Sequence, residues 1–204
     1  SAEVKGRKIK YSNFNLGEVT GLININTEQV DITKLAIPKY SSQLVAKINF
    51  AKQSSNLIVD TKGLKAAEIS SLIHPKLDLT GQLTAVTKVE SLFSKPQIES
   101  DLKVTDGSIS GKQNFDSLNL DLSYDYQEQN LMLEQGNINY KDSKLKLSGT
   151  MIDQNLNFNF SSPGLVWEDI NFTDKLKELV GSAEVEGSVY GTLDSPKLAA
   201  KFNT

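Results

Sequence analysis

Residues 118–124 read Leu-Asn-Leu-Asp-Leu-Ser-Tyr, and the alternation of apolar and polar residues continues through three further runs as far as residue 160. Successive side chains of a β-strand point to opposite faces, so each run has one apolar face and one polar face. The gaps between the runs, residues 125–130, 136–143 and 153–155, are rich in residues that favour turns. The stretch from 115 to 160 therefore predicts an antiparallel meander with one apolar surface.

The apolar surface of this meander is the candidate functional site. Alternating strands usually fill the core of a closed sandwich or barrel with such residues. Two features favour an open surface instead: the chain repeats in units, and it has few large aromatic side chains to fill a lumen. The candidate residues are Leu102, Val104, Leu118, Leu120, Leu122, Leu131, Leu133, Leu145, Leu147, Leu156, Phe158 and Phe160.

The rest of the chain extends the same pattern and interrupts it twice. A weaker alternation in residues 1–60 predicts strands at 4–11, 18–26, 29–34, 44–50 and 56–60. Within residues 64–73, Ile69, Leu72 and Ile73 have helical spacing and predict a short amphipathic helix. Residues 174–180 predict a second one. Both helices are too short to be stable without packing against the sheet.

Similar phrases follow the two predicted helices and indicate an internal repeat. Residues 77–83 read Leu-Asp-Leu-Thr-Gly-Gln-Leu, and residues 183–189 read Ala-Glu-Val-Glu-Gly-Ser-Val. Each phrase leads to a turn that contains a proline, Pro96 or Pro196. We therefore expect one β segment over residues 1–204, with repeat units near 64–160 and 174–204. The second unit is incomplete, so we also expect the chain to be a piece of a longer protein.

The composition argues against several classes of function. The 204 residues carry a formal net charge of -3 without a basic patch, so nucleic acid is not an expected partner. There is no cysteine, which excludes disulfides and thiolate chemistry. The only histidine, His74, directly precedes Pro75, where contact with the carbonyls of a helix end is expected rather than a role as a base. We expect no enzymatic activity, metal ion or cofactor.

Two further features of the sequence favour structural roles. Asp116, Asp121 and Asp125 recur along one run without the spacing of a calcium-binding loop, and they predict a solvated strand face. Trp167 is the only tryptophan and follows Pro163 and Gly164. It predicts a side chain that fills a corner of the sheet rather than one that contacts a ligand.

Three phrases of the chain resemble the repeat signature of a known family. Residues 191–198 read Gly-Thr-Leu-Asp-Ser-Pro-Lys-Leu, and their earlier counterpart at 93–98 reads Phe-Ser-Lys-Pro-Gln-Ile. Residues 102–109 read Leu-Lys-Val-Thr-Asp-Gly-Ser-Ile. These phrases are similar to the patterns G-x-L-x-x-P-x-L and L-x-v-x-x-G-x-i of the TamB/AsmA-like family of the diderm bacterial envelope. The resemblance covers residues 64–204.

The resemblance implies a fold and a function. The fold would be all-β: a long curved antiparallel sheet folded into an open groove, or β-taco, here with two short amphipathic helices. The groove would shield phospholipid acyl chains between the inner and outer membranes, as in bridge-like lipid-transfer proteins. The resemblance also implies a location in the periplasm and an inner-membrane anchor in a segment outside this chain. The full-length protein would have an outer-membrane partner of the Omp85 class.

Two other functions remain open at this point. An exposed strand edge would let the chain act as an assembly factor for outer-membrane β-barrel proteins, by pairing with an incoming strand. A sealed and dry interior would make the chain a structural spacer, like a β-solenoid. An open apolar groove is expected to retain lipid, whereas neither alternative requires it.

Overall fold

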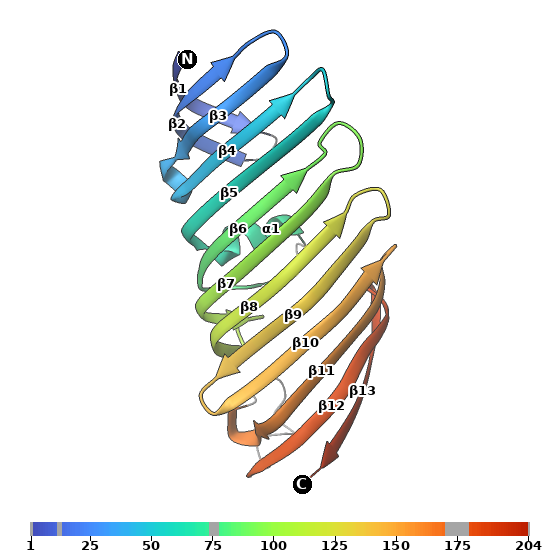
Figure 1. Cartoon of the computed structure of the whole chain (residues 1–204). Helices are drawn as coiled ribbons and strands as arrows, with labels where there is room; N and C mark the ends of the chain where they lie inside the picture. Colours follow the sequence, from blue (N-terminus) through green and yellow to red (C-terminus); the bar gives the residue numbers. More distant parts are fainter. Residues whose placement is uncertain (1, 12–13, 74–77, 170–179, 204) are drawn as a thin grey trace.

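The computed structural model describes residues 2–11, 14–73, 78–169 and 180–203, which form one open antiparallel sheet of thirteen strands (Figure 1). The strands follow one another in the sheet in sequence order, so the described strands form a meander. The all-β antiparallel fold predicted from the sequence is confirmed. The strands are β1 (Ala2–Tyr11), β2 (Phe14–Ile25), β3 (Gln29–Ile37), β4 (Ser42–Asn49), β5 (Ser54–Lys65), β6 (Gln82–Glu90), β7 (Gln97–Ile109), β8 (Gln113–Asp125), β9 (Asn130–Tyr140), β10 (Ser143–Ile152), β11 (Asn155–Val166), β12 (Ser182–Thr192) and β13 (Ser195–Asn203).

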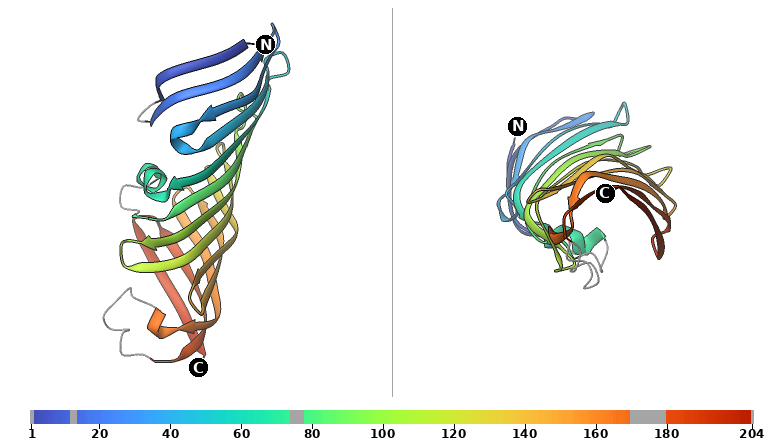
Figure 2. Two further views of the ribbon diagram at one scale, coloured as in Figure 1. Left: turned by 90° about the vertical axis from the view of Figure 1, so that its left-hand side faces the viewer. Right: turned by 90° about the horizontal axis from the view of Figure 1, so that it is seen from below.

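The sheet is strongly twisted and curled. Seen from below in Figure 2, it follows an incomplete ring. Among the described strands, β1 pairs only with β2 and β13 pairs only with β12, so the sheet has two free edges. The helix α1 (Ala66–Ile73) lies at the open side of this curl, next to β5 (Figure 2).

The helical segments agree in part with the prediction. α1 confirms the helix predicted within residues 64–73, and Pro75 follows it in the sequence, where a helix is disfavoured. The second predicted helix, at 174–180, lies almost wholly outside the described residues. Two short 3-10 turns complete the list of helical elements in the described part of the chain: η1 (Pro38–Tyr40) and η2 (Trp167–Asp169).

One predicted turn is wrong. Residues 136–140 belong to β9, and the chain reverses between β9 and β10 in only two residues, Lys141 and Asp142. The cause is a β-bulge at Glu134 and Gln135, where β9 has one residue more than each of its two neighbours. A bulge shifts the alternation by one residue, so apolar residues before it have odd numbers and those after it have even numbers. The break in the pattern resembled a turn.

Two phenylalanines lie over glycines of the neighbouring strand. Phe115 is opposite Gly107, and Phe160 is opposite Gly187. A Cβ atom at either glycine would collide with the partner ring and with a backbone oxygen. Glycines inside strands permit such close approach and occur where a sheet bends, with an aromatic ring covering the site. These two pairs therefore let the strands curl tightly.

Two long connections join neighbouring strands, one from β5 to β6 and one from β11 to β12, and we call them the first and the second connection. The same backbone hydrogen bond joins the two ends of each connection. In the first connection the backbone N–H of Ala66 donates to the carbonyl of Gly81 at 3.0 Å. In the second, the N–H of Trp167 donates to the carbonyl of Gly181, also at 3.0 Å. Gly81 is thus equivalent to Gly181. The repeated phrases in the sequence pair it with Gly187 instead, which lies in the middle of β12.

The best-packed part of the molecule lies beside α1. Ala66 at the start of this helix is 1% exposed, and Val104 and Phe115 on the adjoining strands are each 2% exposed. Large apolar side chains buried together in this way contribute about 1.5–3 kcal/mol each to stability. The cluster is completed by further residues of β5, β6 and β8. Its buried members are Leu64, Ala66, Leu83, Val104, Phe115 and Leu118.

Candidate functional site

All twelve predicted site residues lie on one face of the sheet, which we call the apolar face. Residues directly opposite each other on neighbouring strands point to the same side, so the pairing defines rows of side chains that cross the strands. Four such rows run from β7 to β11. Their predicted members are Val104, Leu118 and Leu145 in the first row; Leu102, Leu120, Leu147 and Phe160 in the second; Leu122, Leu133 and Phe158 in the third; Leu131 and Leu156 in the fourth.

Burial divides these twelve residues into two groups. Val104, Leu118 and Leu133 are buried. The other nine are half-buried, which means that part of each side chain contacts solvent. A closed core would bury most of them, whereas a free surface would expose most of them. The apolar face is therefore partly covered, and the cover is greatest near α1.

An apolar cavity of about 480 Å³ lies on this face toward β13. Its volume is within the roughly 300–1,000 Å³ of small-molecule pockets. Three predicted residues line it: Leu145, Leu147 and Phe160. The prediction missed the contributions of η2, β12 and β13, although alternation was visible there too. The main additional apolar lining residues are Ile109, Phe115, Ile138, Leu165, Trp167, Val185, Val189, Leu198 and Phe202.

The apolar face becomes more polar toward the N-terminal strands. In the second row, Ser42 and Thr61 replace the leucines, and their buried hydroxyl oxygens are 2.9 Å apart. In the third row, Thr87 and Ser100 form a similar pair at 2.8 Å. A hydrogen-bonded hydroxyl pair satisfies its own polar atoms but offers less apolar surface than leucine. The most apolar part of the face is therefore between β8 and β12.

Trp167 reaches the cavity from η2, which is held by a buried carboxylate. Asp169, also in η2, is 5% exposed. Its Oδ2 accepts a hydrogen bond from the Ser143 hydroxyl at 3.1 Å, and its Oδ1 lies 3.0 Å from Nζ of Lys141. The Gln113 side chain donates to its backbone carbonyl at 2.9 Å. These contacts, which we call the η2 clasp, join η2 to β8 and to the β9–β10 turn.

The η2 clasp also affects the ionisation of Lys141. The hydrogen bond to Asp169 is the main cause that raises the pKa of Lys141 above its ordinary value of 10.5, and the charge of Asp169 acts in the same direction. The side chain of Lys141 remains exposed to solvent. The ion pair is therefore present throughout the physiological pH range.

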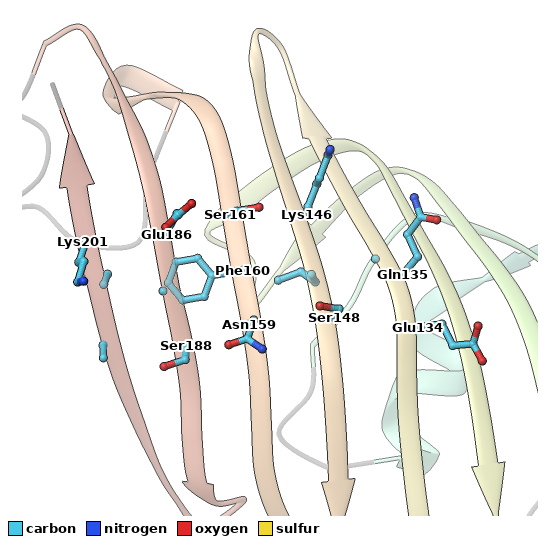
Figure 3. Close-up of a pocket in the computed structure, with 15 residues that line it drawn as sticks. Glu134, Gln135, Lys146, Ser148, Asn159, Phe160, Ser161, Glu186, Ser188 and Lys201 are labelled. Carbon is cyan, nitrogen blue, oxygen red and sulfur yellow. The ribbon is translucent and has the colours of Figure 1, made fainter.

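The opposite, polar face has a depression of its own across β9–β13, of about 810 Å³ (Figure 3). Its charged side chains are Glu134, Lys146, Glu186 and Lys201; three serines, Asn159 and Gln135 also line it, and so do Leu147 and Phe160. Acidic and basic groups alternate along it, so its charge favours neither an anion nor a cation. The apolar face provides the more specific chemistry.

The described residues show no group of three or more histidine, cysteine or carboxylate side chains that would hold a metal ion. No described helix has both the length and the hydropathy needed to cross a bilayer. His74 lies outside the described residues. Comparison with models of protein families, with curated proteins and with solved structures finds no significant match. Interpretation of the site therefore depends on its own geometry.

Proposed function

We propose that the apolar face is a groove that shields lipid acyl chains, and that the chain is a segment of a protein that transfers phospholipid between the two membranes of a diderm envelope. The observation that carries the proposal is the apolar cavity of about 480 Å³ in the most apolar part of the apolar face. Most of its lining side chains are aliphatic or aromatic, and the polar ones are Gln113, Asn114, Ser143 and Asp169. Such a surface has no evident role in a protein that leaves it facing water.

The chemistry of the face suits a ligand that must bind and also move. Burial of apolar surface contributes about 25 cal/mol per Å², and this free energy depends on contact area rather than on the head group. The four rows cross β7–β11 without a charged side chain among the predicted residues. No single polar contact would fix a bound acyl chain in one place. An alkyl chain is therefore expected to slide along the rows at little cost.

The periplasmic location and the partner of the Omp85 class belong to the same proposal. They are supported by the resemblance of residues 64–204 to the TamB/AsmA-like repeat signature. The half-buried state of nine of the twelve site residues supports a groove over a sealed spacer, because a dry interior would bury them.

The free edge of β13 favours a second function, strand pairing with a client protein. Every residue of β13 is exposed, and among the described strands none pairs with its outer edge, which is where strand pairing with another chain would occur. However, Pro196, Lys197 and Lys201 lie on β13, and proline and lysine are residues that discourage such pairing. We therefore rank strand pairing below lipid binding.

The decisive experiment is native mass spectrometry with lipid extraction on the chain purified from bacterial cells without detergent. The wild-type chain is expected to carry phospholipid. Leu147→Asp is expected to fold, because Leu147 lines the cavity where water can hydrate the new carboxylate, but to lose the bound lipid.

The matched control is Ser148→Asp, which places the same charge on the next residue of β10, on the polar face. This variant is expected to keep its lipid. Circular dichroism of both variants separates loss of binding from loss of fold. A folded wild-type chain that neither copurifies with lipid nor acquires it from phospholipid vesicles would contradict the proposal and favour strand pairing or a spacer.

A further inference from the structure

One side of the cavity is closed by an aromatic pair. The ring centroids of Trp167 and Phe202 are 5.3 Å apart, at an interplanar angle of 47°. Phe202 is opposite Val185 on β12, and Val185 is opposite Ser162 on β11. Val185 and Ser162 are 2% and 1% exposed, so this end of the apolar face is covered. An alkyl chain that lies along β12 from Val189 toward Val185 therefore meets the aromatic pair.

Trp167 is held from both sides along the backbone. Its own N–H donates to Gly181 at 3.0 Å, and Val166 immediately before it donates its N–H to the Ser143 hydroxyl at 2.9 Å. Two residues after it, Asp169 is fixed by the η2 clasp. The backbone that carries the indole is thus anchored to β10 and to the start of β12. A side chain on such a support keeps its position when a ligand arrives.

The equivalent position in the first connection is Ala66. Its N–H donates a hydrogen bond to the carbonyl of Gly81, as the N–H of Trp167 does to the carbonyl of Gly181. There the apolar face is filled by Phe115 and its neighbours, and alanine is the residue that fits. In the described part of the second connection a cavity borders this position, which has the largest side chain available. The tryptophan therefore lies where it borders empty space rather than packed core.

We propose that Trp167 is a selectivity residue: with Phe202 it closes the cavity and limits the length of the alkyl chain that can be buried there. The proposal rests on the lipid-binding function proposed above. The ligand class is a single unbranched alkyl chain. Among the described residues that line the cavity, Asp169 is the only charged one, and Ser143 and Lys141 already contact its carboxylate oxygens. Asp169 acts only as a positioning residue.

The first test uses the wild-type chain and needs no substitution. Trp167 is the only tryptophan, so fluorescence excited at wavelengths that the six tyrosines do not absorb reports on this position alone. Stearate brominated near its methyl end quenches tryptophan on contact. Strong quenching is expected, together with unchanged binding by native mass spectrometry. Brominated stearate could bind with full occupancy and leave the fluorescence unchanged. Trp167 would then not lie at the end of the bound alkyl chain, and the inference would be overturned while the lipid-binding function stands. If stearate does not bind at all, the proposed function fails first.

The second test measures the affinities of laurate, myristate, palmitate and stearate for the wild type, Trp167→Ala and Trp167→Phe. Each methylene that becomes buried raises affinity roughly fourfold. The wild type is expected to stop gaining affinity at a certain length. Trp167→Ala is expected to continue gaining at longer chains, and Trp167→Phe to behave as the wild type because the wall remains. The same limit in a folded Trp167→Ala variant would overturn the inference.

The third test addresses the positioning role of Asp169. In Asp169→Ala the indole of Trp167 is expected to become mobile and more exposed to water. Its fluorescence emission is then expected to shift to longer wavelength, and the limit on alkyl chain length to weaken. The control is Asp142→Asn, which removes the same charge from the exposed β9–β10 turn. If Asp169→Ala only lowers stability, and leaves the emission and the length limit as in the wild type, the positioning role is refuted.

Discussion

The first and the second connection share one backbone hydrogen bond but differ in how the apolar face beside them is packed. Beside the first, between β5 and β6, Phe115 and Val104 are each 2% exposed and the apolar face is packed. Beside the second, between β11 and β12, a cavity of about 480 Å³ remains, and Leu198 and Phe202 on β13 are 69% and 53% exposed. The strands in both regions alternate in the same way. What differs is the element that covers the face.

The difference shows that alternation defines a face but not its occupancy. α1 and the segment that returns to β6 supply apolar side chains such as Ala66 and Leu79 to the first region. In the described part of the second connection, η2 supplies one large apolar side chain, Trp167. The same kind of strand therefore lies against packed side chains in one region and borders a cavity in the other.

The largest expected effect comes from the two phenylalanines that cover glycines. Phe115→Ala is expected to lower the free energy of unfolding by about 3–5 kcal/mol, because it opens a void in packed core. Phe160→Ala is expected to cost only about 1–2 kcal/mol, because Phe160 is half-buried beside an existing cavity. Urea unfolding followed by circular dichroism measures both. Equal losses would show that the second region is as well packed as the first.

A smaller effect is expected at the glycines themselves. Gly107→Ala places a Cβ against the Phe115 ring and the Thr80 carbonyl, at a cost of about 2–3 kcal/mol. Gly187→Ala meets the Phe160 ring and the Ala199 carbonyl on the edge strand β13, which has no further neighbour among the described strands to hold it in place. Its cost is expected to be nearer to about 1 kcal/mol. The comparison of the two melting temperatures checks this order, and a larger loss for Gly187→Ala would contradict it.

The smallest effect concerns the η2 clasp and its dependence on pH. Folding raises the pKa of Lys141, so the charged form is favoured in the folded state. This contribution to stability is fully present below the ordinary value of 10.5 and is lost as the pH rises through the higher pKa of the folded state. Thermal unfolding of Lys141→Met is therefore expected at a slightly lower temperature than wild type at neutral pH.

That difference is expected to shrink as the pH rises above 10.5 and then through the higher pKa of the folded state, where the lysine loses its charge in the folded protein as well. Lys144→Met is the control, since Lys144 is an exposed lysine on β10 three residues away. A difference that persists unchanged at high pH would show that the ion pair with Asp169 does not cause it.

The sequence predicts the strands and the shared face well because both depend on local periodicity. The alternation is visible within one strand at Leu118, Leu120 and Leu122. Pairing with the neighbouring strands keeps these three side chains on the same face. It fails at Glu134, where a bulge shifts the phase. A bulge is a property of two paired strands, so one strand's pattern resembles a break.

The cavity could not be predicted in the same way. Trp167 and Phe202 are 35 positions apart in the numbering and meet only because β11, β12 and β13 bring them together. Nor does the alternation of Leu145 and Leu147 distinguish a filled face from an empty one. Burial depends on what crosses the face, and that is decided by tertiary structure.

The order of the strands has a consequence for how the molecule tolerates change. Every described strand pairs only with its neighbours in sequence, so the strand ladders join consecutive segments, and one isolated bridge, between Leu79 and Ile109, departs from this order. Such a chain behaves as a linear array of units, each stabilised by the next, in which folding can begin at more than one place and spread. Hairpins could then be added or removed in pairs of strands without altering the registers elsewhere, which would lengthen or shorten the apolar face in regular steps.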